Sequence, residues 1–330
     1  MRNTITDVPG ILVGHAQDEK AGTGCTVVLC ESGAVAGVDV RGGAPGTRET
    51  DCLDPSNFVP AVHAIYLGGG SAFGLDGASG VMRYLEEKGI GLDVGVCRVP
   101  IVPGAVIFDL PVGDCRVRPS AQMGYDACRA AGAEVAQGNV GAGTGASVGK
   151  AAGLSRTMKG GLGTASIRSG DLIVGAIVAV NCYGDVLDAE TGEILAGALT
   201  EDRSGFAVTT RLMSRSPDSV DPFSGNTTIG VVATNARLDK AQAERVAMMA
   251  HDGFARAIDP IHTMHDGDTI FALATGGVDA DITVTGALAA RVMAQAIASA
   301  VRHAKSAYGL PCHAELQTLI RRRQPPMAAE

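Results

Sequence analysis

Short β-branched runs alternate with longer helical stretches along most of this chain, and this alternation most restricts its possible folds. We expect strands at residues 11–15, 26–30, 35–40, 64–67, 105–110, 164–168, 172–182, 228–234 and 269–275. We expect helices at residues 72–88, 121–131, 240–257 and 283–306. The last two helices are rich in alanine, which suits close packing on a sheet. The pattern predicts an α/β or layered α+β domain, such as a sandwich of sheets between helices.

Glycine is the outlier in the composition. It supplies 45 of 330 residues, about twice its ordinary share. Glycine inside apolar segments indicates tight turns and close approaches between backbones. The least regular stretch is 200–226, which is rich in Gly, Pro, Ser and Asp. These residues mark a loop, and a loop of this length is usually functional or disordered.

The net charge and the cysteine content limit the binding partners and the cellular compartment that we expect for this protein. The net charge is −8 and the pI is about 5.4, and the acidic balance argues against nucleic acid or a membrane surface as a partner. The basic run 321–323 lies in a Pro-containing tail and reads as a solvated end. The eight cysteines form no CxxC pair, and there is neither a signal-peptide core nor a run of 18 apolar residues. We therefore expect a cytoplasmic protein with reduced thiols.

A polar, turn-forming run meets an apolar strand at residues 224–235, and Thr227 lies at the junction. Cleavage of the Asn226–Thr227 bond would give Thr227 a free α-amine beside its hydroxyl. Such an amine has a pKa of about 7.7–8.0, which suits general-base catalysis near neutral pH. The junction thus suggests a self-processed N-terminal-nucleophile hydrolase. Taken alone it is more typical of an ordinary loop-to-strand boundary, and its Asn-Thr-Thr sequon is irrelevant in the cytoplasm.

Two other short motifs have alternative explanations. Gly145-Ala-Ser147-Val-Gly149 matches the G-x-S-x-G elbow of serine hydrolases, but the elbow needs a preceding strand. The glycine-rich run 138–145 before Ser147 is a poor strand, so a Ser147 nucleophile is a minor alternative. Gly149-Lys150 resembles part of a P-loop but lacks its first glycine and its final Ser/Thr.

The glycine-rich turn 68–74 follows an expected strand and opens an expected helix. It is able to hold an anion at the helix N-terminus, but Phe73 breaks the dinucleotide pattern, and we expect the turn to serve close strand–helix packing instead. His262, His265 and Asp266 lack further ligands at the spacing that zinc requires. We expect no metal and no cofactor.

Six segments, taken together and in this order, carry a family resemblance: residues 41–51, 68–76, 138–145, 159–166, 226–235 and 265–271. They resemble the DmpA-type self-processing aminopeptidases, which include L-aminopeptidase/D-esterases, β-aminopeptidases and nylon-oligomer hydrolases. The resemblance implies a four-layer α/β/β/α sandwich, similar to that of ornithine acetyltransferase. It also implies a single domain, 1–330, cleaved into 1–226 and 227–330, with the two chains remaining together, usually in a homo-tetramer.

The resemblance also assigns the site. It makes Thr227 the nucleophile and Asn226 the end of the larger chain, a junction more similar to the nylon-oligomer hydrolases than to the Gly-Ser junction of the aminopeptidases. The supporting catalytic side chains that it implies are Lys150, Asn181, Asp266 and Asp268. The substrate-binding residues that it implies are Phe108, which replaces a tyrosine of that branch, Gly70 and Ser71.

These residue types fit the chemistry. Asp266 and Asp268 would share one face of a strand and hold the Thr227 amine and hydroxyl, whereas in a turn they would be an exposed acidic loop. Lys150 would stabilise the deprotonated hydroxyl or keep the amine neutral. The alternative is a surface lysine at 150, with Lys159 as the active-site lysine.

Asn181 lies at the end of an expected strand, where its amide N–H would stabilise a tetrahedral oxyanion. In other acyl-transfer enzymes such a donor contributes about 3 kcal/mol. The alternative role is a cap on the turn at Tyr183-Gly184.

We therefore expect two acyl transfers at Thr227: self-cleavage, and then hydrolysis of a small-molecule amide or short peptide through an acyl-enzyme. An N-acyltransferase and an unprocessed small-ligand-binding protein remain alternatives. The sequence leaves open whether the substrate is an L-, D-, β- or ω-amino-acid derivative.

Overall fold

A mixed nine-stranded sheet forms the centre of the computed structural model, which describes residues 1–215 and 225–323. Its strand order is β10-β11-β14-β16-β2-β4-β7-β3, with β1 also paired to β2. The strands of this sheet are β1 (Leu12–Asp18), β2 (Thr23–Val40), β3 (Thr47–Arg48), β4 (Val62–Gly68), β7 (Gly104–Val106), β10 (Gly161–Ser169), β11 (Leu172–Asn181), β14 (Thr227–Ala236) and β16 (Thr269–Val278).

Shorter strands and the helices surround this sheet. The shorter strands are β5 (Leu92–Asp93), β6 (Arg98–Val99), β8 (Ser147–Val148), β9 (Met158–Lys159), β12 (Asp185–Leu187), β13 (Ile194–Ala196) and β15 (Ile258–Asp259). The α-helices are α1 (Gly77–Glu87), α2 (Ala121–Arg129), α3 (Thr209–Arg215), α4 (Lys240–Ala257), α5 (Ile282–His303) and α6 (His313–Arg323).

The sheet folds into two layers, and the long strand β2 runs from one layer into the other. Its first part pairs with β1 and β4, and its last part, from Val35 to Val40, pairs with β16. The register with β4 shifts between Leu29 and Ala34. The two strands expected at 26–30 and 35–40 are therefore one continuous strand that belongs to both layers.

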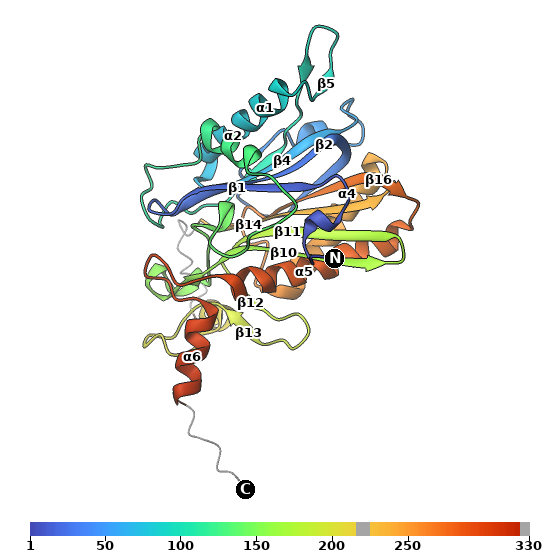
Figure 1. Ribbon diagram of the computed structural model, residues 1–330. Coiled ribbons are helices and arrows are strands. Elements are labelled where there is room, and N and C mark those ends of the chain that lie inside the picture. The colour runs from blue at the N-terminus through green and yellow to red at the C-terminus, as the bar shows by residue number, and fades with distance from the viewer. Residues whose placement is uncertain (216–224, 324–330) are drawn as a thin grey trace.

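The helices and the two parts of the sheet form four layers (Figure 1). Three hydrophobic clusters lie between these layers. One cluster joins α1 and α2 to β2 and β4, and includes Tyr66 and Leu85. A second fills the space between the two sheet layers and includes Ile65 and Ile177. The third joins the other sheet face to α4 and α5 and includes Phe254. The expected four-layer α/β/β/α sandwich is confirmed.

Side chains alternate between these clusters along each strand, as the two-residue period requires. In β14, Ile229 faces the inter-sheet cluster and Val232 faces the helices. In β11, Ile177 also faces the inter-sheet cluster. The same parity places Thr227 and Asn181, at adjacent ends of the two strands, on the face toward the space between the sheets.

The two long helices pack closely, as their alanine content predicts. A Cβ at Gly253 of α4 would lie 2.3 Å from the carbonyl oxygen of Ala290 of α5. The start of α4 is fixed by a capping box between Asp239 and Gln242. By length and composition alone α5 is apolar enough to cross a membrane, yet 67% of that stretch is buried inside the protein. It is therefore the core helix of the sandwich.

Several expected boundaries were wrong. The strand expected at 105–110 ends at Val106, because the chain then turns and the N–H of Ile107 bonds to the Gly68 carbonyl. The irregular stretch 200–226 contains α3, and its residues 216–224 lie outside the described part. The tail expected at 321–323 instead ends α6, which projects from the body in Figure 1 and whose side chains from 321 onward are not described.

Candidate active site

The Asn226–Thr227 peptide bond lies in a clamped, buried stretch. Asn226 donates its N–H to the carbonyl of His265 at 3.1 Å, and its own carbonyl accepts the N–H of Gly267 at 3.1 Å. Thr227 begins β14, is only 4% exposed and stands opposite Asn181 in the ladder. Its hydroxyl donates to the carbonyl oxygen of Asn226. The hydroxyl thus lies against the carbonyl group of the bond expected to be cleaved.

Gly267 completes this clamp, and the sequence pattern did not indicate it. A Cβ at this position would lie 2.7 Å from the Thr227 hydroxyl oxygen and 2.7 Å from the carbonyl oxygen of Ala44. Only glycine leaves that space open while its N–H bonds to the Asn226 carbonyl. The only available signal was its place between Asp266 and Asp268.

Asp266 is fully buried beside the end of β11. One carboxylate oxygen accepts the backbone N–H of Tyr183 at 3.3 Å, and the other accepts the hydroxyl and N–H of Thr263. Burial raises the pKa of Asp266 to about 6, and the negative charge of Asp268 adds to the rise. This carboxyl therefore titrates close to neutral pH.

Asp268 is also fully buried and is held on both sides. One oxygen accepts the N–H of Thr228, the residue after the candidate nucleophile, at 2.8 Å. The other accepts the N–H of His262 at 3.0 Å and contacts the same residue's Nδ1 at 2.9 Å. Asp266 pairs with Asn226 in an isolated parallel bridge and Asp268 directly precedes β16, so the two do not lie on one continuous strand as expected. The alternative of an exposed acidic loop was also wrong, because both side chains are fully buried.

Lys150 reaches the end of β11. It is buried, and its Nζ donates to the Asn181 carbonyl at 3.1 Å and to the side-chain Oδ1 of Asn181 at 2.9 Å. Burial lowers the pKa of Lys150 to about 8. The Asn181 Oδ1 also accepts the Ser147 N–H, while its Nδ2 donates to the carbonyl of Phe108 at 3.1 Å. The lysine is thus tied to the residue that faces Thr227 across the ladder.

Lys159 is buried in a different environment. Its Nζ donates to the carbonyls of Gly143, Ala146 and Gly160 at 3.0, 2.8 and 3.2 Å. Burial lowers its pKa to about 7. Three backbone acceptors match the three donors of an ammonium group, so Lys159 braces the glycine-rich segment. The contact with Asn181 favours Lys150 as the active-site lysine, and neither residue is a surface lysine.

Phe108 lies beside the junction, and Gly70 and Ser71 are bonded to the two residues that flank Phe108 in sequence. A Cβ at Gly225 would meet the Phe108 ring at 2.4 Å. Gly70 donates its N–H to Asp109 at 2.6 Å, and Ser71 donates its N–H to the Ile107 carbonyl at 3.0 Å. These bonds join the glycine turn to the segment that carries Phe108. They agree with the packing role of that turn rather than with an anion site.

The remaining motifs lack their structural context. Ser147 lies in β8, which follows a short 3-10 turn and leads into another rather than into an α-helix. The serine-elbow alternative therefore loses its support. His262 is occupied with Asp268, and the described residues contain no cluster of three or more His, Cys, Asp or Glu side chains placed to hold a metal.

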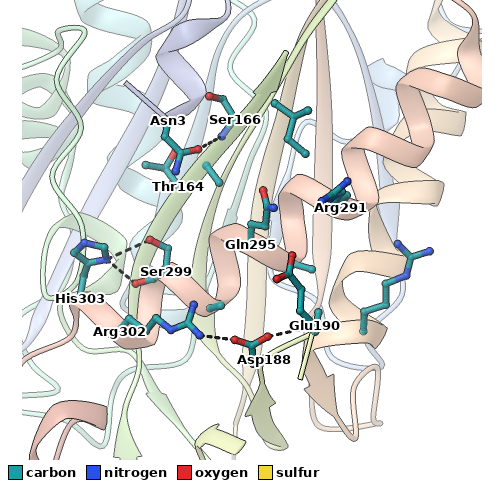
Figure 2. Close-up of a pocket in the computed structure, with 16 residues that line it drawn as sticks. Asn3, Thr164, Ser166, Asp188, Glu190, Arg291, Gln295, Ser299, Arg302 and His303 are labelled. Atoms are coloured by element: carbon teal, nitrogen blue, oxygen red, sulfur yellow. Dashed lines mark hydrogen bonds and ion pairs between the residues drawn. The ribbon is translucent and has the colours of Figure 1, made fainter. Parts of the chain in front are cut away.

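A separate groove of about 940 Å³ lies on the far side of β10, between this strand and α5 (Figure 2). There the Ser166 N–H bonds to the Asn3 side chain at 3.0 Å, and Arg302 pairs with Asp188. None of the five candidate catalytic residues lines it. The groove is therefore distinct from the Thr227 site.

Comparison with known proteins identifies relatives over nearly the whole chain. The family model described as peptidase family S58 matches residues 3–314. An uncharacterized aminopeptidase of Mycobacterium tuberculosis is 46% identical over 348 aligned residues, covering 95% of this chain and 98% of the relative. A 6-aminohexanoate-oligomer endohydrolase of Kocuria sp. is 32% identical over 312 residues, covering 90% and 85%.

A solved structure shares the fold. The L-aminopeptidase D-Ala-esterase/amidase of Ochrobactrum anthropi, described as a variant of the Ntn hydrolase fold, matches with a TM-score of 0.71 at 18% identity, over 97% of this chain and 94% of that one. The family resemblance predicted from the six segments is thus confirmed. The chain is a hydrolase of peptide or amide bonds and belongs to peptidase family S58.

Proposed function

We propose that this protein is an N-terminal-nucleophile amide hydrolase that cleaves its own Asn226–Thr227 bond and then uses Thr227 to hydrolyse small amides or short peptides. The single observation that carries the proposal is the Thr227 hydroxyl lying against the Asn226 carbonyl, in a peptide clamped by residues 265–267. Positioning of this kind supplies much of the rate of an intramolecular reaction.

Self-cleavage begins with attack of the Thr227 hydroxyl oxygen on the carbonyl carbon of Asn226. Lys150 has a pKa of about 8, which suits a base that takes the hydroxyl proton near neutral pH. The Gly267 N–H, already bonded to the Asn226 carbonyl, stabilises the oxyanion. The C–N bond then breaks, the Thr227 nitrogen leaves as an amine, and water hydrolyses the resulting ester to free the Asn226 carboxylate.

The mature site repeats this chemistry on a substrate. The freed α-amine of Thr227 takes the proton of its own hydroxyl, and the oxygen attacks the substrate carbonyl. Asn181 stands opposite Thr227 and uses one amide N–H on Phe108, which leaves its second N–H for the oxyanion. The substrate amine departs, and water releases the acid from the acyl-Thr227 ester. No cofactor takes part.

The substrate is an amino-acid amide, a short peptide or an amino-acid oligomer. The Asn-Thr junction and the 6-aminohexanoate-oligomer endohydrolase among the relatives favour an extended aliphatic acyl chain. We further propose that the two processed chains, 1–226 and 227–330, stay together in a cytoplasmic homo-tetramer. The eight free cysteines support a reducing compartment.

The intact mass of the purified protein under denaturing conditions tests self-cleavage. The wild type should give two species, one ending at Asn226 and one beginning at Thr227, whereas Thr227→Ala should give one chain of 33.5 kDa. The variant should also lose amide hydrolysis. A Thr227→Ala protein that still matures and hydrolyses amides would refute the proposal, and an intact, inactive wild type would favour the unprocessed ligand-binding alternative.

Hydrolysis and acyl transfer share the acyl-enzyme and differ only in the acceptor. Adding a primary amine to the assay and looking for an acylated amine separates the two. We expect free acid to remain the main product.

A further inference from the structure

His262 is bonded to one of the two buried aspartates, and the proposed mechanism gives it no role. Its Nδ1 lies 2.9 Å from the Oδ2 of Asp268, and its backbone N–H bonds to the same oxygen at 3.0 Å. The other oxygen of Asp268 accepts the N–H of Thr228 at 2.8 Å. Two donors from one residue thus fix one end of a carboxylate whose other end holds the residue after the nucleophile.

The His262 ring is itself held by α4. The ring of His251 packs edge-on against it, with 4.8 Å between the two ring centroids. The ring of Phe254 stacks on it, with 6.2 Å between the centroids. His262 has a φ of +59°, a conformation that asparagine tolerates better than most side chains do. The ring therefore has a defined place, with its Nδ1 toward Asp268.

After cleavage, the bonds from His262 to Asp268 and from Asp268 to Thr228 matter more for holding Thr227 in place. In the intact chain Asn226 is clamped by His265 and Gly267, so Thr227 is held from its N-terminal side. After cleavage Thr227 becomes a chain end, and such ends fray unless they are tied down. Thr227 and Thr228 stay paired with β11 on one side. On the other side the pairing of β14 with β16 begins at Ile229, so there the bond between Asp268 and Thr228 holds the start of the strand.

We propose, on the basis of the proposed function, that His262 is a positioning residue: it locks the Asp268 carboxylate onto Thr228 and so aims the mature Thr227 nucleophile. It acts through Asp268 and does not itself touch the reacting atoms. Its loss therefore lowers turnover by the mature site more than it slows self-cleavage.

The titratable groups around His262 determine how its loss should change the dependence of activity on pH. Asp266 lies on the same turn, His251 faces the ring from α4, and Asp39 and Arg41 lie beyond His251 at the end of β2. Burial lowers the pKa of His251 to about 4, so it is neutral throughout the working range. Loss of a donor to the carboxylate pair makes negative charge there less favourable, which moves the acid limb of activity to higher pH.

The test compares His262→Leu, His262→Asn and His262→Gln in the full chain. Asparagine places an amide N–H where Nδ1 lies, while glutamine places it one bond further away and leucine has none. His303→Leu is the matched control, because His303 is an exposed histidine on α5 that bonds to Ser299. The substrates are the p-nitroanilides of L-alanine, D-alanine and β-alanine and a 6-aminohexanoate oligomer, and the best of them is used for all variants.

His262→Leu should lower kcat by about tenfold to a hundredfold, the range for a lost bond to a charged group, with KM within about twofold. Its acid limb should move up by about one pH unit, and self-cleavage should slow by less than about threefold. His262→Asn should restore kcat to within about threefold of the wild type, and His303→Leu should match the wild type.

The inference would be overturned if the wild type matures and is active and the His262→Leu variant has the same kcat and the same pH profile. The proposed function would still stand in that case. If His262→Leu does not fold, the Asn and Gln variants decide, because equal activity of the two would also overturn it. A wild type that never matures would overturn both proposals.

Discussion

Two buried lysines close to the same strand end occupy contrasting environments. Lys150 and Lys159 are both almost fully buried, and burial lowers the pKa of both, to about 8 and about 7. Lys159 donates only to backbone carbonyls, which belong to Gly143, Ala146 and Gly160. Lys150 donates to the carbonyl and side chain of Asn181, the residue opposite Thr227.

This difference shows what a perturbed pKa does and does not indicate. Desolvation alone shifts the pKa of any buried lysine, so the shift does not distinguish a catalytic group from a structural one. The partners of the ammonium group distinguish them. Lys159 has three backbone acceptors, whereas Lys150 shares its acceptor, the Oδ1 of Asn181, with the Ser147 N–H and is bonded to the residue opposite the candidate nucleophile.

The strongest test of this contrast is Lys150→Met. Methionine keeps most of the apolar length of lysine and removes the base proposed for self-cleavage, so we expect self-cleavage to slow by about a thousandfold, within the range for general-base catalysis. Turnover per total protein should fall with it, because the uncleaved chain lacks the free α-amine of Thr227 that serves as the base in the mature site. Mass spectrometry follows cleavage, and a chromogenic amide assay follows turnover. Cleavage at the wild-type rate would show that another group accepts the Thr227 proton.

The matching variant, Lys159→Met, should act on stability instead. It leaves three buried carbonyls without their donor, and such losses cost about 1–3 kcal/mol each where water cannot enter. We expect a loss of about 3 kcal/mol in the free energy of unfolding, measured in the Thr227→Ala background so that every protein is one chain. Activity per folded molecule, measured with Thr227 present, should stay within a few fold of the wild type. A thousandfold loss of activity with unchanged stability would reverse the roles of the two lysines.

The sequence predicted the parts of the molecule that depend on local pattern. The apolar alternation located β11, β14 and β16 to within a few residues, and the expected helix at 240–257 coincides with α4. The position of Thr227 opposite Asn181 follows from two adjacent strands that end together. The order of the four layers came from the family resemblance rather than from the periodicity.

The parts that the sequence did not predict depend on contacts between distant segments. Nothing in the residues around Lys159 indicates that its ammonium group meets carbonyls 13 and 16 positions away. From the sequence, His262 was weighed only as a metal ligand and that role was set aside, and no pattern indicated its bond to Asp268, because that bond depends on how the segment between β15 and β16 folds back on itself. Gly267 resembled many other glycines until its distance to the Thr227 hydroxyl was known.

The smallest expected effect is on the pH dependence of the free energy of unfolding, to which the two lysines should contribute at different pH. Each has a folded-state pKa below the ordinary lysine value of 10.5, so above that folded pKa the unfolded chain binds more protons than the folded one. Stability therefore rises with pH in this range. In the Thr227→Ala background, Lys159→Met should flatten the rise between pH 7 and 8.5 by up to about 1.4 kcal/mol per pH unit.

Lys150→Met should flatten the rise mainly around and above pH 8, about one pH unit higher than Lys159→Met does, because the pKa of Lys150 is the higher of the two. Denaturant unfolding at intervals of half a pH unit measures both slopes. Parallel curves for the parent and the Lys159→Met variant would mean that Lys159 keeps its proton in the folded protein. Its three carbonyl partners would then hold a full ammonium charge, and the contrast with Lys150 would rest on charge state as well as on partners.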